Sequence, residues 1–335
     1  MITIRDIARE CKVSTSTVSK AINNYPTIPE ETKKRIKEVI ERMGYVPNAA
    51  AAGLSRGSSS NVGILGFLKD GESPFTHPMF SSILSTFQLE MNKAGYDLLF
   101  IDKLIHGKKG SFLLNCSSRS VSGVLLFGAL RDEGVQEVIN SDIPCVGFDY
   151  YDDKITSVQT NNEKAMFDLT NHLISLGHKN IVFIAGEENS AVTNIRVQGF
   201  KNAMNKAHLP IKDFTIKYVQ YFDYEGVKKE TIDILNNHKD VTAIMYSDDL
   251  SAYAGLKEIK ALGKRVPEDI SITGFDGISI GDLLPIQITS MRQNIAEIGA
   301  KLAQELILLI KNKEETVKLI KVDATLVEGN SVRKI

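Results

Sequence analysis

Apolar residues near the start of the chain recur at helical spacing and predict short helices. The first helix carries its apolar face at positions i, i+3, i+4 and i+7, which are Ile4, Ile7, Ala8 and Cys11. Thr3 and Asp6 form a capping-box pattern at its start. After a break, Ser14 is a good N-cap for a second helix over residues 15–23.

A third helix is predicted over residues 30–43 from the same apolar spacing, and Gly44 ends it. Two short helices joined by a tight turn and braced by a third describe a helix-turn-helix. The outer face of the second helix carries short hydroxyl side chains and one lysine, which suit a helix that enters a major groove. A generic three-helix bundle with a solvated polar face fits the pattern equally well.

The pattern changes at Asn61, where continuous apolar runs begin to alternate with amphipathic helices. The runs cover residues 61–68, 96–102, 121–128, 143–148, 180–186, 241–246 and 270–275. Runs of this kind are typical of parallel strands that helices cover on both faces. They predict a doubly wound α/β fold in two lobes, which binds ligands at the carboxyl ends of its strands and closes by a hinge.

The balance of charged residues also changes near residue 60, where the apolar pattern changes. The net charge of all 335 residues is −1, but residues 1–60 hold ten Lys or Arg against six Asp or Glu. A small basic segment on an acidic body indicates one region that binds a polyanion. Cys11, Cys116 and Cys145 have no CxxC spacing, so we expect buried reduced thiols and a cytoplasmic protein.

Motifs for other functions are lacking in the sequence. There is no export signal at the start and no apolar run of about 18 residues that would span a membrane. There is no GxGxxG, no P-loop and no evident nucleophile–base pair, so we expect no enzyme and no cofactor. His172 and His178 lie six residues apart, which is not a metal-binding helix spacing, and we expect them at the surface or at helix caps.

Two stretches carry a specific resemblance to a known family. The segments TIRDIARECKVSTSTVSKAINN and ETKKRIKEVIERMGYVPNAAAAGL resemble the DNA-binding end of the LacI/GalR family of bacterial regulators. More diffusely, SLGHKNIVFIAG, IRVQGFKNAM, VPEDISITGFD and ITSMRQNIAEIGAKLAQELI resemble that family's sensor domain. The resemblance implies an all-α helix-turn-helix domain followed by an α/β two-lobed, doubly wound sensor like a periplasmic binding protein.

The resemblance also sets expected boundaries. The helix-turn-helix domain covers 1–46, a hinge helix and linker cover 47–60, and the effector-binding and dimerisation domain covers 61–335. One lobe takes about 61–160 and 290–322, and the other takes about 161–289 and 323–335. The chain then crosses between lobes near 157–162, 288–292 and 320–324.

By the same resemblance the DNA contacts are Thr15, Ser16, Thr17, Ser19, Lys20, Asn23, Leu54 and Arg56. Leu54 would be the minor-groove wedge at the end of the hinge helix, although an isolated leucine is also a simple core residue. Three departures from the family pattern stand out. Lys12 replaces a turn glycine, Pro29 stands at the cap of the third helix, where Thr27 with Glu30 offers an alternative cap, and Ala52-Gly53 replaces Arg-Ser.

The expected effector contacts follow strand ends or line the pocket in relatives of this family. They are Phe75, Met79, Phe80, Asp149, Arg196, Phe222, Asp248, Asp276 and Gln293. Each aspartate has the alternative role of a helix N-cap, and Asp249 is interpreted as the cap beside Asp248. Carboxylates with one arginine suit a neutral polyol, because a purine or a phosphorylated ligand prefers more donors and positive charge.

The sequence therefore predicts a dimeric repressor of carbohydrate-utilisation genes that binds a pseudopalindromic operator and responds to a small molecule, with a sugar favoured. One alternative is a global catabolite regulator whose sensor domain binds a phosphorylated carrier protein. Another is a sugar-modifying enzyme with an accessory DNA-binding domain, which the absence of catalytic motifs disfavours. No leucine heptads follow at NSVRKI, so we expect a dimer and not a tetramer.

Overall fold

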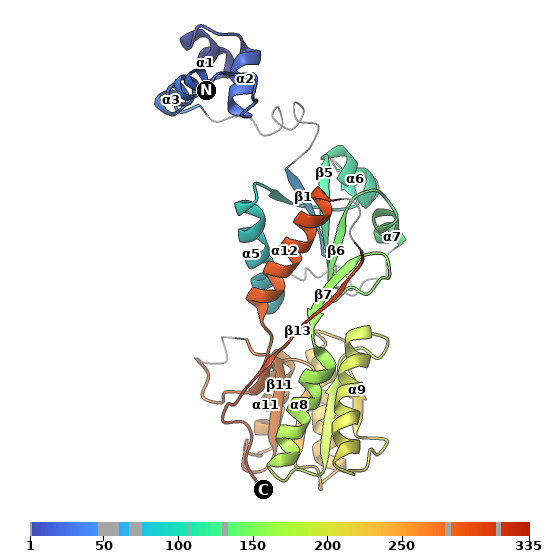
Figure 1. Cartoon of the computed structure of the whole chain (residues 1–335). Coiled ribbons are helices and arrows are strands. Elements are labelled where there is room, and N and C mark those ends of the chain that lie inside the picture. The colour runs from blue at the N-terminus through green and yellow to red at the C-terminus, as the bar shows by residue number, and fades with distance from the viewer. Residues whose placement is uncertain are drawn as a thin grey trace.

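The computed structural model describes residues 2–45, 60–66, 76–105, 107–128, 133–278, 283–312 and 316–335. The first of these ranges folds into three helices (Figure 1): α1 (Ile4–Glu10), α2 (Thr15–Ile22) and α3 (Glu30–Met43). The predicted apolar faces meet in one small core, in which Ile7 and Val18 are fully buried. The helix-turn-helix prediction is thereby confirmed at the level of the fold.

Local chemistry sets the ends of these helices. Thr3 donates its N–H and its hydroxyl to Asp6 at 2.9 and 2.7 Å, as the capping-box pattern predicts. Gly44 adopts a left-handed conformation with φ 65° and ends α3. The alternative cap for α3 is wrong: Pro29 is the N-cap residue without any side-chain hydrogen bond, and Glu30 instead accepts from Lys33 Nζ.

The remainder of the described chain forms two α/β lobes, each built on a six-stranded sheet (Figure 1). The first sheet has the strand order β13-β7-β6-β5-β1-β2, and every neighbouring pair is parallel. Its strands are β1 (Asn61–Gly66), β2 (Asp97–Phe100), β5 (Val121–Phe127), β6 (Cys145–Phe148), β7 (Thr156–Thr160) and β13 (Leu319–Val322). A small hairpin, β3 (Leu104–Ile105) with β4 (Lys108–Lys109), follows β2.

The second sheet has the order β14-β12-β11-β10-β8-β9, in which only the β12–β14 pair is antiparallel. Its strands are β8 (Ile181–Ala185), β9 (Ile216–Tyr218), β10 (Ala243–Tyr246), β11 (Ser271–Asp276), β12 (Thr289–Arg292) and β14 (Thr325–Val327). Fully buried, uninterrupted strands such as β8 and β10 explain why their apolar runs lack alternation.

Helices cover both faces of each sheet and bury its apolar side chains. On the first sheet, α5 (Pro78–Lys93) and α12 (Ile295–Lys311) cover one face, and α6 (Phe112–Ser118) and α7 (Glu133–Ile139) cover the other. On the second, α8 (Asn162–Ser175) packs with α9 (Ala191–Lys206), and α10 (Tyr224–Asn237) packs with α11 (Asp249–Ala261). This is the predicted doubly wound architecture.

The chain passes between the two sheets three times. It leaves the first sheet after β7, returns to it between β12 and α12, and leaves it again between β13 and β14. Because β12 pairs within the second sheet, the second crossing follows Arg292, slightly later than the predicted 288–292. The three connections follow the carboxyl ends of β7, β12 and β13.

Candidate functional site

Helix α2 presents a polar face opposite its buried one. Val18 is fully buried, whereas Thr15, Ser16 and Lys20 are exposed, and these three are the predicted base-reading residues. Ser14 Oγ accepts the backbone N–H of Thr17 at 3.0 Å, which fixes the start of the helix. The hydrophobic anchor and the N-cap thus hold the open face rigidly for an external partner.

The other predicted DNA contacts near α2 are partly engaged inside the protein. The Thr17 hydroxyl lies 2.9 Å from the Ser14 hydroxyl, Ser19 is half-buried, and the Asn23 amide donates to the Ser19 carbonyl at 2.9 Å. In the preceding turn Lys12 has φ 51°, a left-handed conformation at the position where the family usually has glycine. Leu54 and Arg56 lie outside the described residues.

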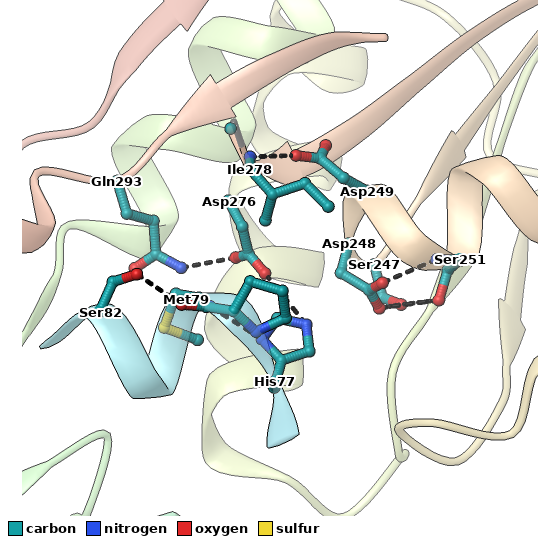
Figure 2. A network of polar contacts seen from close by, with 12 residues as sticks. His77, Met79, Ser82, Ser247, Asp248, Asp249, Ser251, Asp276, Ile278 and Gln293 are labelled. Atoms are coloured by element: carbon teal, nitrogen blue, oxygen red, sulfur yellow. Dashed lines mark hydrogen bonds and ion pairs between the residues drawn. The ribbon is translucent and has the colours of Figure 1, made fainter. Parts of the chain in front are cut away.

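A second polar site lies between the two lobes, at the carboxyl ends of the strands (Figure 2). Asp276 ends β11 and is 3% exposed. Its Oδ1 accepts the Gln293 amide at 2.6 Å, and its Oδ2 lies 3.9 Å from His77 Nε2. Gln293 Oε1 in turn accepts the Thr160 hydroxyl, so one buried network joins the first two crossings.

Burial makes the ionised form of the Asp276 carboxyl unfavourable in free energy. Burial raises the pKa of the Asp276 carboxyl, while Arg196 and His77 act against that rise. A carboxylate held in this way gains from any group that donates hydrogen bonds to it. The predicted residues Asp276 and Gln293 are therefore brought together in one cleft.

Arg196 projects from the second turn of α9 and is 5% exposed. Its Nε donates to Asn162 Oδ1 at 2.8 Å, and its Nη1 donates to the Ser247 carbonyl at 2.9 Å. Its guanidinium carbon lies 3.7 Å from the centroid of the Phe275 ring, a cation–π contact. These contacts hold the planar fork in a fixed orientation.

Asp149 follows β6, with φ 50° and 9% exposure. Its Oδ1 has no hydrogen-bond partner among the described residues. Burial raises the pKa of Asp149 to about 7 and the Asp276 charge adds to that rise, whereas Arg196 lowers it. A buried acceptor without a donor is costly, and a ligand hydroxyl removes that cost.

The helix cap at the start of α11 is Asp248, not Asp249. Asp248 is the N-cap: its Oδ1 accepts the Ser251 N–H at 2.7 Å, and its Oδ2 accepts the Ser251 hydroxyl (Figure 2). The interpretation of Asp249 as the cap is wrong. Asp249 is 3% exposed and accepts from Ser290 Oγ at 2.7 Å and from Ile278 N–H at 2.8 Å, and burial raises its pKa to about 8.

Aromatic side chains form the wall of the cleft on the first lobe. Phe80 is 9% exposed and makes edge contacts with Phe127 and Phe148 at centroid distances of 6.0 and 5.9 Å. Met79 belongs to the same buried cluster, and half-buried Phe222 packs against it. Phe75 lies outside the described residues. Met79, Phe80 and Phe222 therefore belong to the packed core of the first lobe or lie against it.

Sequence reasoning missed several polar groups in the cleft. His77 is buried as the N-cap of α5: its Nδ1 accepts the Met79 N–H at 3.3 Å, and its ring contacts Phe80 and Phe222. The hydroxyl of Tyr221 lies 2.8 Å from that of Thr193. The only signal for His77 was its place before Pro78, where an N-cap is common. His178 is also buried, not at the surface, between Thr242 and the Arg333 carbonyl.

No cluster of three or more His, Cys, Asp or Glu side chains with metal-binding geometry occurs in the described ranges. None of the helices formed by those residues is long and apolar enough to cross a membrane. All three cysteines are buried and free.

Two family models match separate parts of the chain. The model of the lacI family of bacterial regulatory proteins matches residues 3–48, and that of a periplasmic binding protein-like domain matches residues 170–332. Catabolite control protein A of Priestia megaterium is 31% identical over 324 residues, which cover 93% of each chain. The HTH-type transcriptional repressor PurR of Aliivibrio salmonicida is 28% identical over the whole of both chains.

Solved structures share the fold. The lac repressor dimer bound to operator and the anti-inducer ONPF superposes with a TM-score of 0.82, at 20% identity and 99% coverage of both chains. The complex of the transcriptional regulator CelR with cellobiose gives a TM-score of 0.71 at 22% identity, with 99% of this chain and 100% of that one covered.

Proposed function

Because this chain belongs to the lacI family of bacterial regulatory proteins, we propose that it represses carbohydrate-utilisation genes and that a neutral sugar in the interlobe cleft controls it. DNA binding through the helix-turn-helix is the property of the family. The identity of the effector class is our inference from the cleft. The observation that carries it is the set of buried carboxylates around a single arginine.

The cleft has the chemistry of a polyol site. Asp149 and Asp276 are buried acceptors, and Arg196 is the buried cation beside them. Sugar hydroxyls donate to carboxylates, while Phe80 and Phe222 offer apolar surface to the C–H side of a sugar ring. A phosphorylated effector would bring at least one further negative charge to a site that already holds two carboxylates.

On the DNA side, we propose that Thr15, Ser16 and Lys20 read base edges and that Thr17, Ser19 and Asn23 contact the backbone. The exposure of the first three supports direct reading, because their side chains have free access to a groove. The engagement of Thr17 and Asn23 in local hydrogen bonds suits a positioning role. Leu54 and Arg56 stay predictions for the hinge.

The two sites communicate through the crossings. Gln293 touches Asp276 in the cleft and Thr160 at the end of β7, so an effector that binds Asp276 acts on two of the three connections. A rotation of one lobe on the other changes the distance between the DNA-binding ends of two paired subunits. Linkage then requires DNA to change effector affinity by the same factor.

We propose a homodimer, because a pseudopalindromic operator is read by two copies of α2. Large apolar side chains at the β2 edge of the first lobe support this: Phe100 is 62% exposed and Leu104 is 55% exposed. A second copy of the chain is the occupant we propose for this edge. Sedimentation of the purified chain would give twice its 37.0 kDa mass, and a monomer at micromolar concentration would contradict the proposal.

We also propose that the protein acts in the cytoplasm and is a regulator, not an enzyme. The relatives by which the family is recognised are transcription regulators, and buried reduced thiols suit a reducing compartment. Measurable turnover of any sugar by the purified chain would contradict the proposal that it is not an enzyme.

A thermal-shift screen tests the effector class. Neutral sugars, sugar phosphates and purines are compared at equal concentration, since a ligand that binds only the folded state raises its midpoint. We expect a neutral sugar to raise the midpoint and sugar phosphates to have no effect. Stabilisation by phosphorylated compounds alone would contradict the proposal.

A second candidate is a catabolite regulator that binds a phosphorylated carrier protein, which the similarity to Catabolite control protein A favours. It differs from the first in its partner, not in its DNA-binding role. A pull-down with such a carrier, in phosphorylated and unphosphorylated form, separates the two candidates.

A further inference from the structure

Four buried polar atoms without hydrogen-bond partners among the described residues belong to one short stretch of chain: Asp149 Oδ1, the Tyr151 hydroxyl, Gln159 Oε1 and Asn162 Nδ2. Three of them, in Asp149, Tyr151 and Asn162, belong to residues that also interact with Arg196. The stretch runs from the end of β6 to the start of α8, where the chain first passes between the lobes. Buried polar groups are nearly always paired, so the three atoms in residues that interact with Arg196 require an explanation.

The three atoms belong to one site, because their residues interact with the same neighbours. Burial raises the pKa of the Tyr151 phenol and the Asp149 carboxylate raises it further, whereas Arg196 and hydrogen bonding with the Asn162 side chain lower it. Asn162 Oδ1 is occupied by Arg196 Nε at 2.8 Å, and the Tyr151 hydroxyl and Asn162 Nδ2 lie near each other without hydrogen-bond geometry between them. Asn162 is 1% exposed and Asp149 is 9% exposed.

The chemistry of the three atoms defines what could satisfy them. Asp149 Oδ1 accepts, Asn162 Nδ2 donates, and a tyrosine hydroxyl does either. One hydroxyl group can donate to Asp149 and accept from Asn162 or Tyr151 at the same time. A carboxylate or phosphate offers only acceptors, so it would leave Asp149 unpaired and would repel its charge.

We propose that Tyr151 is a specificity-determining effector contact, and that with Asp149 and Asn162 it forms a subsite for a hydroxyl group of a neutral polyol. The inference rests on the proposed sugar-responsive function and extends it to a residue that neither the sequence pattern nor the strand-end rule singled out. Because Tyr151 lies in the connection between β6 and β7, the effector would also touch the segment that leads into the first crossing.

Tyr246 provides a matched control for the orphan hydroxyl. It is fully buried in the second lobe, and its hydroxyl lies 3.0 Å from the Thr231 hydroxyl and is therefore satisfied. Tyr151→Phe and Tyr246→Phe each remove one buried oxygen atom. In the absence of effector, Tyr246→Phe should lower the thermal midpoint by about 2–4 °C, whereas Tyr151→Phe should leave it unchanged or raise it.

Effector binding is measured by calorimetry on the full chain with D-ribose, D-glucose, D-galactose and cellobiose as probes. For the sugar that binds the wild type, Tyr151→Phe should weaken binding by roughly 5- to 15-fold, and Tyr246→Phe should leave it unchanged. The deoxy analogue that lacks the contacted hydroxyl should bind wild type and Tyr151→Phe equally.

The outcomes separate this inference from the function on which it rests. A sugar that binds wild type and Tyr151→Phe with equal affinity would overturn the role of Tyr151 alone. A fall in the effector-free midpoint of Tyr151→Phe equal to that of Tyr246→Phe would also overturn it, because the hydroxyl would then have a partner. If no probe sugar binds the wild type, the polyol class fails together with the proposed function.

Discussion

The imidazole of His77 lies 3.9 Å from the carboxylate of Asp276, and the two side chains come from different lobes (Figure 2). His77 Nδ1 accepts the Met79 N–H, so a neutral ring carries its proton on Nε2, the atom that faces Asp276. The first lobe therefore contributes a donor to a buried carboxylate of the second. If an effector hydroxyl binds Asp276 as proposed, it enters the space that faces His77.

Replacing His77 by alanine should loosen the first lobe from the second when no effector is bound. We expect faster amide hydrogen exchange at Met79 and Gly277, because both segments lose the contact that His77 makes between them. His172→Ala, at a half-buried position on α8, is the control and should leave exchange at these amides as in the wild type. Equal exchange in all three proteins would show that the contact does not restrain the lobes.

Asp249 should make stability depend on pH. Its pKa is raised from an ordinary value of 3.8 to about 8, so between these values the folded state keeps a proton that the unfolded state has lost. The contribution of Asp249 to the free energy of unfolding is therefore fully present below about pH 4. It is lost as the pH rises towards 8, by at most about 1.4 kcal/mol per pH unit.

Urea unfolding between pH 5 and 8 checks this prediction. Asp249→Asn mimics the protonated form, since it can accept from Ile278 and donate to Ser290, and its stability should be flatter with pH. Asp269→Asn is the control: Arg265 lowers the pKa of Asp269, so this variant should keep the wild-type slope. An unchanged slope in Asp249→Asn would contradict the assignment.

Replacing Arg196 by alanine should abolish the thermal response to sugar and leave DNA affinity nearly unchanged. It should also destabilise the second lobe by about 1–3 kcal/mol, because Asn162 Oδ1 and the Ser247 carbonyl lose their donor. Arg265→Ala removes an exposed arginine from the same lobe, and we expect no measurable loss of stability because solvent screens its ion pair with Asp269. Retention of the full sugar response by Arg196→Ala would exclude it from the effector site.

Lys20→Ala should relax base preference at one operator position, with a loss of roughly 1–3 kcal/mol of discrimination if the lysine contacts a guanine. Lys37→Ala removes the same charge from an exposed position on α3, so it controls for net charge. Binding to a set of single-base operator variants at fixed salt distinguishes the two. If Lys20→Ala keeps the wild-type ranking of the variants, Lys20 does not read bases.

The sequence predicted the elements whose chemistry is local. Apolar runs located buried strands such as β8 and β10, and the capping patterns at Thr3 and Ser14 located helix starts. Strand β7, TSVQT, was not predicted as a strand because it is buried but polar. Its hydroxyl side chains bond groups outside the strand: Ser157 donates to the Tyr150 carbonyl and Thr160 donates to Gln293 Oε1.

In the cleft, likewise, the sequence predicts some of the polar residues and not others. The aspartates that follow strands were predictable because doubly wound folds place ligands there. Which of Asp248 and Asp249 caps α11 depends on a shift of one residue, and the hydroxyl of Ser290, far along the chain, decides it. For His77 the sequence offers only a possible N-cap before Pro78, and its approach to Asp276 on the other lobe has no local signal. Tyr151 has no signal of its own in the sequence.

The most direct test of the account is binding of the purified full chain to genomic DNA fragments at fixed salt, with and without the sugar that stabilises it. We expect the chain to prefer a pseudopalindromic fragment over bulk competitor DNA. We also expect its Kd for that fragment to change by at least about fivefold when the sugar is present. The account also predicts the reciprocal change in sugar affinity when that fragment is bound. Equal binding to all fragments under every sugar tried would contradict it.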